Sequence, residues 1–280
     1  MGVGLLYHLA KEGWKDVVLV EKGELTSGST WHAAGLIPHF IGSLNMAKIH
    51  LYGADLYKKL ENETGQATGW HGCGAIRLAI DKDQLDWFHY VKGVLDQVGA
   101  ECHLLGPDEI KKVHPLLETD GFLMGAYTTG DGHTDPSGAT QAMAVGARNL
   151  GAEIYLNNRV TDTNLLPSGE WEVITEKGSI ICEHLVNAAG SFCEQVGMMA
   201  GIKVPMVNMV HQYLMTETIP EVAALEKELP VVRDPRSSCY YRQEQNGLII
   251  GPYEMNAKAW GLEGIDWSFD NALLPPDMER

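Results

Sequence analysis

The N-terminal residues place a helix directly before a buried strand, and this order limits the folds open to the chain. Residues 3–12 have leucines at helical spacing on one face, and Gly13 is expected to end the helix. Residues 16–21 then form an apolar run closed by Glu21, as in a strand buried in a parallel sheet. A helix, a short turn and a strand in this order predict half of a βαβ unit.

The same segment matches the second half of a dinucleotide-binding motif, in which a strand leads through GxGxxG into a helix and a second strand. Gly2 would be the third glycine, while the first strand and the other glycines would precede Met1. Glu21 stands where an acid accepts hydrogen bonds from the ribose hydroxyls, which disfavours a 2′-phosphate. The half-motif is weak alone, because N-terminal glycines and a strand-end charge also explain it.

The composition excludes several classes of function. Acidic residues outnumber basic ones by 37 to 21, and the formal charge of −16 argues against nucleic acid and anionic membranes as partners. The five cysteines are odd in number and form no CxxC, so a disulfide framework is not expected. No apolar run approaches ~18 residues and no secretory signal is visible, so we expect no membrane span.

Further elements follow from periodicity and end signals. Helices are expected over residues 45–64 and 83–98, and from Asp135, which can cap a helix that runs to about Leu150. Residues 26–35 are rich in small side chains and are expected to form a loop that runs into a helix start. Strand patterns cover residues 153–156, 171–175, 179–182, 185–190 (as a buried strand), 210–216 and 248–253.

Residues 21–36, EKGELTSGSTWHAAGL, closely resemble the flavin loop of the dimethylglycine and sarcosine dehydrogenases. Within this block, we use the name flavin loop for the segment of small residues, 26–35. The STWHAAG block within it is specific to that family, whereas NAAG is shared by many flavoproteins. The resemblance spans essentially the whole chain, with further blocks at 7–14 (YHLAKEGW), 130–136 (GDGHTDP), 187–190 (NAAG), 211–213 (HQY) and 240–244 (YYRQE).

The resemblance implies an α/β fold in which an FAD-binding Rossmann-like domain of the glutathione-reductase type is interleaved with an α+β substrate domain on an antiparallel sheet. The FAD-binding domain would take residues 1–36 and 150–204, and the substrate domain residues 37–149 and 205–280. Relatives also carry a complete first strand, a later glycine-rich segment and often a folate-binding domain. We therefore expect a fragment that folds poorly alone and holds FAD weakly.

By resemblance, His32 bonds through a ring nitrogen to the 8α-methyl group of FAD, which should raise the flavin's potential. Without the resemblance, a histidine beside Trp31 would be read as a packed, hydrogen-bonded residue. For Val160, implied to contact adenine through its backbone, an ordinary place in a strand core is an equal explanation. The implied cofactor-binding residues are Glu21, Lys22, Gly28, Ser29, Thr30, Trp31, His32, Ala33, Ala34, Gly35, Leu36, Val160, Ala189 and Gly190.

The reaction implied by the resemblance removes a hydride from an N-methyl group, which requires a neutral amine and a nearby proton acceptor. By resemblance, His211 accepts the proton or orients the amine, and Tyr240 hydrogen-bonds the substrate or tunes that histidine. Each could instead be an ordinary residue of a sheet or core. A substrate carboxylate would favour a guanidinium, and Arg233 and Arg242 are both candidates because they lie near Tyr240 in sequence.

Two other groups of residues carry less weight. His133 and Asp135 match the family pattern within GDGHTDP, although helix capping alone explains Asp135. Histidine and cysteine pairs elsewhere lack the two-ligand spacing of a zinc site, so no metal is expected.

The sequence thus predicts FAD-dependent oxidative N-demethylation of dimethylglycine or sarcosine, with an electron-transfer flavoprotein as acceptor. Folate would bind only through a further C-terminal domain. The alternatives are a non-catalytic regulatory relative, like the regulatory subunit of pyruvate dehydrogenase phosphatase, and an oxidase with non-covalent FAD. Bacterial cytoplasm and mitochondrial matrix both fit as locations.

Overall fold

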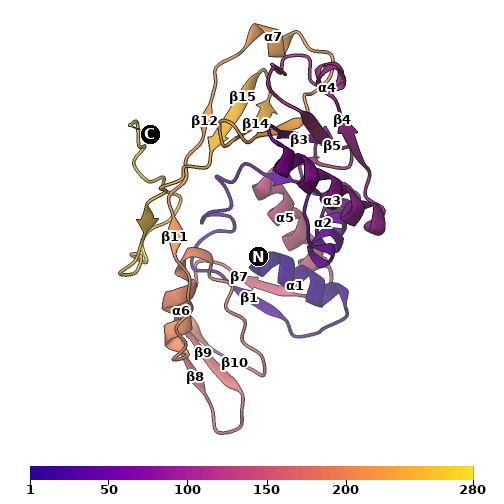
Figure 1. The fold of residues 1–280 in the computed structure, drawn as a ribbon. Helices are drawn as coiled ribbons and strands as arrows, with labels where there is room; N and C mark the ends of the chain where they lie inside the picture. Colours follow the sequence, from indigo (N-terminus) through magenta and orange to yellow (C-terminus); the bar gives the residue numbers. More distant parts are fainter. Residues whose placement is uncertain (280) are drawn as a thin grey trace.

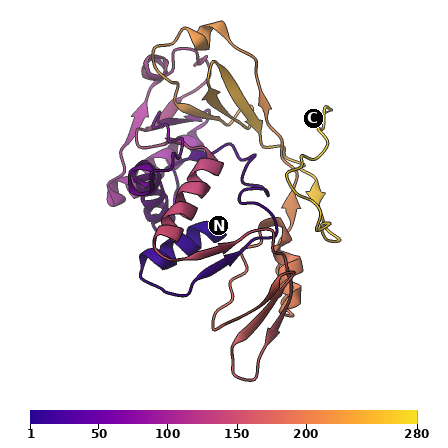
Figure 2. The same cartoon turned by 180° about the vertical axis from the view of Figure 1, so that it is seen from behind.

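The structure is a computed structural model that describes residues 1–279. Figure 1 shows a large sheet and its helices at one end of the molecule and a small three-stranded sheet at the other, with α1 and the strands β1 and β7 between them. The view from behind shows the C-terminal segment running along the side of the molecule (Figure 2). No helix among the described residues is both long and apolar enough to span a membrane.

The N-terminal helix and strand form as the sequence predicts. α1 spans Gly2–Lys11, and β1 (Val18–Val20) follows it. β1 pairs in parallel with β7 (Glu153–Tyr155), so the chain does return beside its first strand. α5 (Pro136–Asn149), the helix predicted from Asp135, lies against α1 and feeds into β7.

α1, α2 and α5 share one apolar core. α2 spans Leu44–Thr64 and ends at Gly65 in the left-handed conformation, as its sequence predicts. Leu60 of α2 is completely buried in this core. Gly146 lets α5 approach α1 closely, because a Cβ there would lie 2.7 Å from the ring of Tyr7.

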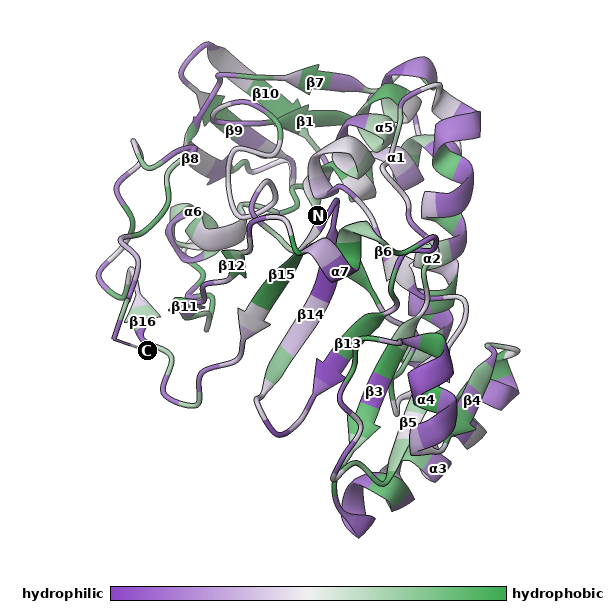
Figure 3. Ribbon diagram, turned by 90° about the horizontal axis from the view of Figure 1, so that it is seen from above, coloured by the Kyte–Doolittle hydropathy of each residue, from purple (hydrophilic) through white to green (hydrophobic). Residues whose placement is uncertain are grey.

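The larger sheet has seven strands in the order β12-β15-β14-β13-β3-β5-β4. All neighbours are antiparallel except β13 and β3, which run parallel. Figure 3 shows the central strands side by side. Their bounds are Ala75–Ala79 (β3), Cys102–Leu105 (β4), Met124–Thr128 (β5), Leu214–Met215 (β12), Val231–Asp234 (β13), Cys239–Glu244 (β14) and Gly247–Pro252 (β15).

The two faces of this sheet are covered by different elements. α3 (Lys82–Val98) and Phe40 pack on the face that carries Ala79 and Ala126. α4 (Pro107–Val113) packs on the opposite face, in a core with the fully buried Ile76, Leu78 and Val232. Successive residues of a strand point to opposite faces. Alternation along β3 and β13 therefore places Arg77 and Arg233 on the face that carries Ala79, away from the core beneath α4.

The remaining elements are short. β2 and β6 form a two-stranded ladder that ties the flavin loop to the region before α5. β8, β9 and β10 form the antiparallel three-stranded sheet, against which α6 packs. The bounds are Leu36–Ile37 (β2), Gly132–His133 (β6), Val160–Leu165 (β8), Trp171–Thr175 (β9), Gly178–Cys182 (β10), Gly190–Phe192 (η1, a 3-10 helix), Cys193–Met199 (α6), Asn208–Met209 (β11), Pro220–Ala223 (α7) and Ala259–Trp260 (β16).

Three sequence predictions about local structure are wrong. Residues 185–190 are not a buried strand but a largely exposed segment, because β1 and β7 pair only with each other and offer this segment no strand partner among residues 1–279. The flavin loop leads into β2 rather than into a helix, and α2 begins only at Leu44. Residues 210–216 contain only the end strand β12, since the chain is irregular from 210 to 213.

Candidate functional site

The flavin loop consists of turns with few backbone hydrogen bonds. The Trp31 amide donates to the Thr26 carbonyl at 3.2 Å, and the Ala33 amide donates to the Thr30 carbonyl at 3.2 Å. Small side chains keep this backbone thin, which allows a ligand to approach its amides. The hydroxyl of Ser29 lies 3.5 Å from that of Ser191, which brings η1 beside the loop.

His32 has the properties that a flavin attachment point requires. Its Nδ1 atom is buried and has no hydrogen-bond partner among the described residues. Burial lowers the pKa of His32, because the imidazolium would lose solvation there. The ring lies tilted against that of Trp31, with centroids 4.8 Å apart. A neutral imidazole with an unused nitrogen is the nucleophilic form, so the residue fits covalent attachment to FAD.

Gly35 fixes the end of the flavin loop. Its φ is +70°, and a Cβ there would collide with the carbonyl oxygen of Thr134. The Thr134 amide donates to the Gly35 carbonyl at 3.0 Å, and β2 then pairs with β6 through Leu36 and His133. Leu36, the last residue of the predicted flavin set, is thereby held against the segment before α5. Only glycine allows this close approach.

The start of α1, the end of β1 and the segment before η1 come together. A Cβ on Gly2 would lie 3.1 Å from Leu19 and 3.4 Å from Ala188, so the helix start packs closely on both. This is the role that the third glycine has in a dinucleotide-binding unit. Ala189 and Gly190 follow immediately, with φ +58° at Gly190. Backbone amides at such a junction suit phosphate groups.

Glu21 and Lys22 directly follow the C-terminal end of β1, as the sequence predicts. An oxygen of Glu21 accepts a hydrogen bond from the Gly23 amide at 3.0 Å. The Lys22 ammonium donates to the Phe269 carbonyl at 3.1 Å, so this lysine also ties the C-terminal segment to the loop. Val160 lies at the start of β8, paired with Thr175, and β8 is the outer strand of its sheet, so the backbone of Val160 remains a candidate for adenine.

Four residues of the large sheet form a row on one face, because strand register sets them side by side. Arg77 of β3 pairs with Arg233 of β13, Arg233 pairs with Tyr240 of β14, and Tyr240 pairs with Gly251 of β15. Gly251 leaves room for the tyrosine, since a Cβ there would collide with the ring of Tyr240. The ladder thus places two guanidinium groups next to the tyrosine predicted to be catalytic.

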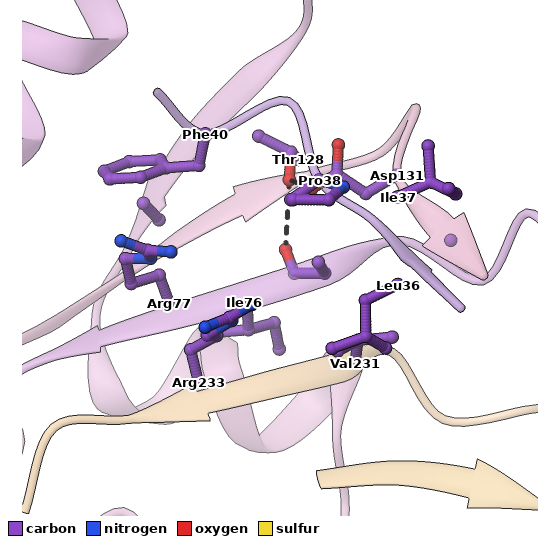
Figure 4. Close-up of a pocket in the computed structure, with 13 residues that line it drawn as sticks. Leu36, Ile37, Pro38, Phe40, Ile76, Arg77, Thr128, Asp131, Val231 and Arg233 are labelled. Carbon is purple, nitrogen blue, oxygen red and sulfur yellow. Dashed lines mark hydrogen bonds between the residues drawn. The ribbon is translucent and has the colours of Figure 1, made fainter. Parts of the chain in front are cut away.

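A pocket lies over the arginine end of this row, Arg77 and Arg233. Its roof is the segment from Leu36 to Phe40, which leaves the flavin loop directly, and Figure 4 shows the side chains of Arg77 and Arg233 on the same side of their strands, beneath that segment. The pocket therefore links the proposed flavin site to the sheet face. Its lining residues are Leu36, Ile37, Pro38, Phe40, Ala75, Ile76, Arg77, Ala126, Thr128, Asp131, Gly132, Val231 and Arg233.

The two predicted catalytic residues, His211 and Tyr240, both lie against the ring of Tyr253. The ring of His211 lies 5.9 Å from that of Tyr253, and the ring of Tyr240 lies 5.8 Å from it. The Nδ1 atom of His211 lies 3.3 Å from a carboxylate oxygen of Glu254. Because a carboxylate only accepts, a neutral His211 carries its proton on Nδ1 and leaves Nε2 free to accept. Burial raises the pKa of Tyr240, so its hydroxyl stays a donor.

Arg242 is occupied elsewhere. It donates to Nδ1 of His133 at 3.0 Å and to Glu244 at 2.6 Å. Nε2 of His133 in turn lies 2.6 Å from Glu228, which also contacts Nδ1 of His71 at 2.8 Å. Of the two arginines that the sequence offers for a substrate carboxylate, only Arg233 thus faces the pocket.

The His71, His133 and Glu228 cluster has the composition of a metal site, and sequence spacing does not reveal it. The hydrogen bond from Arg242 requires the lone pair of His133 on Nδ1, so Nε2 carries the proton that is donated to Glu228. A metal would need that same Nε2 unprotonated, beside a guanidinium. The arrangement is therefore a hydrogen-bond network as it stands.

A second buried pair was also invisible in the sequence. Nδ1 of His39 lies 2.5 Å from Asp131, which also accepts from the backbone amide of His39 and from the hydroxyl of Thr128. Asp131 lies in the GDGHTDP block, so the resemblance marks the segment but not its partner. The same block ends in Asp135, which accepts hydrogen bonds from two amides of the first turn of α5 and is the predicted N-cap.

The chain matches the family of FAD dependent oxidoreductases described as DAO over residues 1–277. It belongs to this family. Over 285 aligned residues it is 45% identical to the mitochondrial dimethylglycine dehydrogenase of Rattus norvegicus, covering 100% of this chain and 33% of that protein. It is 35% identical to the mitochondrial sarcosine dehydrogenase of Homo sapiens, covering 95% of this chain and 30% of that protein. The chain thus spans about a third of the length of these curated relatives.

Solved structures agree with this membership. The L-proline dehydrogenase of P. horikoshii superposes with a TM-score of 0.79 and 27% identity, over 89% of this chain and 66% of that one. The glycine oxidase of Geobacillus kaustophilus shares the fold, with a TM-score of 0.73 and 24% identity over 95% of this chain and 70% of that one. The predicted α/β FAD-binding fold class is confirmed. The residue assignments and the domain limits stay predictions.

Proposed function

We propose that the chain carries the flavin and substrate sites of an enzyme that oxidatively demethylates an N-methylated amino acid. One observation carries the proposal: the loop with His32, whose buried Nδ1 atom has no hydrogen-bond partner among the described residues, runs directly into the roof of a pocket over Arg233. The pocket adjoins Tyr240, the register partner of that arginine. Cofactor attachment and substrate binding thus meet within a few residues of Leu36.

The cofactor is FAD, attached covalently through His32. Membership in the FAD dependent oxidoreductase family supports the choice of cofactor, and the unused Nδ1 supports the attachment. Backbone amides of the flavin loop and of the Gly2, Ala189 and Gly190 junction would hold the flavin and its pyrophosphate. When bound, the flavin supplies the two-electron acceptor for the hydride of the N-methyl carbon.

The protein's own residues prepare the amine. His211 accepts the amine proton on Nε2, because Glu254 orients its Nδ1–H, and a neutral amine is the form that can release hydride. Tyr240 stays protonated through its burial and donates a hydrogen bond to the substrate. Similarity to a dimethylglycine dehydrogenase, a sarcosine dehydrogenase and a 4-methylaminobutanoate oxidase supports an N-methyl amino acid as substrate.

The partners follow from the same family. We propose an electron-transfer flavoprotein as the electron acceptor, and folate binding only through a separate domain. A mitochondrial matrix or bacterial cytoplasmic location fits, as two of the similar proteins are mitochondrial by name.

The test is acid precipitation of the chain, and of the chain extended by any adjoining coding sequence, after expression with riboflavin. Yellow colour should stay with the precipitate, and His32→Ala should release it. His89→Ala, which changes an exposed histidine of α3, is the matched control and should retain the colour. Anaerobic dimethylglycine or sarcosine should then bleach the flavin.

The alternatives predict different results. Flavin that dissociates into the supernatant from the wild-type protein would refute the covalent bond and favour an oxidase with non-covalent FAD. A folded protein with no flavin in either fraction would favour a non-catalytic relative, a reading supported by 32% identity to the regulatory subunit of pyruvate dehydrogenase phosphatase of Mus musculus over 100% of this chain.

A further inference from the structure

Two arginines enter the pocket side by side. Arg77 and Arg233 are directly opposite each other in the parallel pair of β3 and β13, so their side chains leave the same face of the sheet. Neighbouring strands lie about 4.8 Å apart, a separation at which two guanidinium groups can reach one small ligand. Both side chains line the same pocket, as Figure 4 shows.

Neither arginine forms an ion pair within 4.0 Å of a carboxylate among residues 1–279. Arg233 donates one hydrogen bond, at 3.0 Å, to the hydroxyl of Tyr253, and its guanidinium lies over that ring at 5.1 Å. Arg77 lies over the ring of Phe40 at 4.9 Å, and no described residue accepts a hydrogen bond from its guanidinium. Most of the ten N–H donors of the two groups are therefore free.

The local electrostatics are those of an anion site. Burial lowers the pKa of Arg77, and the charge of Arg233 lowers it further. The carboxylate of Asp131 acts in the opposite direction, but its oxygens already accept from His39 and Thr128. Two like charges held together with unused donors are unfavourable, and a bound anion removes that cost.

The position of the pair indicates which anion it binds. The pocket begins at Leu36, where the flavin loop ends, and Arg233 adjoins Tyr240 on the sheet. A ligand held by the pair would thus lie between the flavin site and the predicted catalytic residues. A carboxylate matches the planar fork of a guanidinium, and two forks can bind its two oxygens.

We propose that Arg77 and Arg233 together bind the carboxylate of the substrate and so restrict the enzyme to N-methyl amines that carry an acid group. This inference rests on the proposed amine oxidation. Arg242, which already bonds His133 and Glu244, takes no part. Arg77 is the addition that sequence proximity to Tyr240 does not suggest.

The experiment measures binding without turnover. Methoxyacetate has an ether oxygen in place of the amine of sarcosine and cannot be demethylated by amine oxidation, so its Kd reports the carboxylate site alone. Isothermal titration with methoxyacetate is compared with methoxyethanol, which lacks the carboxylate, and with inorganic phosphate at matched ionic strength. We expect methoxyacetate to bind, methoxyethanol not to bind, and phosphate to bind at least tenfold more weakly.

Single variants then test each arginine. Arg77→Gln and Arg233→Gln should each raise the Kd for methoxyacetate at least tenfold, and Arg77→Lys should recover part of the loss. Arg148→Gln, which removes an exposed arginine at the end of α5, is the matched control and should bind like the wild type. Thermal melting of each variant shows whether it is folded, and the lysine variant keeps the test valid if Arg77→Gln is not.

The outcomes separate this inference from the proposed function. Unchanged methoxyacetate affinity in folded Arg77→Gln, or tighter binding of phosphate than of methoxyacetate, would overturn the carboxylate assignment even if sarcosine bleaches the flavin. Loss of methoxyacetate binding in both arginine variants supports the carboxylate assignment. If no N-methyl amine is oxidised by the same protein, the proposed amine oxidation is abandoned while the carboxylate assignment stands.

Discussion

The flavin loop and the face of the seven-stranded sheet contribute to one site by different physical means. Between residues of the loop only two backbone hydrogen bonds form among the described residues, Trp31 to Thr26 and Ala33 to Thr30, so little within the loop fixes His32. On the sheet, ladder register alone sets Arg77 beside Arg233, over a core in which Ile76 is fully buried. The strand ladder thus fixes the positions on the sheet side without a ligand, whereas the loop has few hydrogen bonds between its own residues to fix it.

This contrast predicts unequal sensitivity to mutation, and the largest effect should lie beneath the sheet. Ile76→Ala removes a fully buried side chain from the core that α4 covers, and should destabilise the chain by about 4 kcal/mol. Ile181→Ala, at a 52% exposed position of β10, should cost less than about 1 kcal/mol. Urea unfolding measures both. Equal losses would show that the buried core beneath the seven-stranded sheet is not the more sensitive position.

The loop should have one rigid point, at its end. Gly35→Ala forces a side chain onto the Thr134 carbonyl at φ +70°, and should destabilise the chain by about 3 kcal/mol. Gly28→Ala places its methyl group in open space and should change stability by less than about 0.5 kcal/mol. Chemical denaturation of the two variants decides the matter, and a mild Gly35→Ala would mean that β2 and β6 separate easily.

A pair of histidines extends the comparison to pH. Burial lowers the pKa of His114, on the sheet side, to about 4, against about 6.5 in an unfolded chain. Between these values the unfolded chain binds more protons, so stability falls as the pH drops from about 6.5 towards 4. The loss should be on the order of 2–3 kcal/mol. Unfolding at pH 7 and pH 4.5 measures it.

His114→Gln should flatten that pH dependence. His32 on the loop side also has a pKa lowered by burial, so it contributes in the same direction, and His32→Ala should flatten the profile less because the side chain is less enclosed. If His114→Gln keeps the full wild-type slope between pH 7 and 4.5, His114 is not the group that titrates.

The smallest expected effect concerns the helix that joins the two regions. Asp135→Ala removes a cap that accepts from two amides of α5, and should cost about 1 kcal/mol. Ser43 precedes α2 and makes no side-chain capping bond, so Ser43→Ala should change stability by a few tenths of a kcal/mol at most. Thermal unfolding distinguishes them, and similar values for both would remove the capping role from Asp135.

Local signals were enough to predict the four longer helices, α1, α2, α3 and α5, and the start of the cofactor unit, but not the short helices α4, α6 and α7. α2 and α5 have periodic apolar faces and recognisable end residues, Gly65 and Asp135, and both formed where expected. Residues 185–190 failed because an apolar run becomes a strand only beside another strand, which no local pattern reveals. Pairing partners are a long-range property.

The candidate site divides in the same way. The flavin loop is contiguous, so its residues could be assigned from one block of sequence. Arg77 and Arg233 become neighbours only through the register of a parallel pair, and His39 meets Asp131 only through folding. Side chains from distant segments with no shared motif leave no joint signal in a single sequence.

The ladder of β2 and β6 joins the flavin loop to the region of the large sheet. Leu36 and Ile37 pair with Gly132 and His133, two residues before the helix start at Asp135. The flavin loop is therefore joined through this ladder to the segment before α5, and through Leu36 to the segment that covers the pocket. Gly35, with φ +70° and packed against the Thr134 carbonyl, is the point at which the loop is fixed, so a cofactor held by the loop would lie directly beside the segment that covers the pocket.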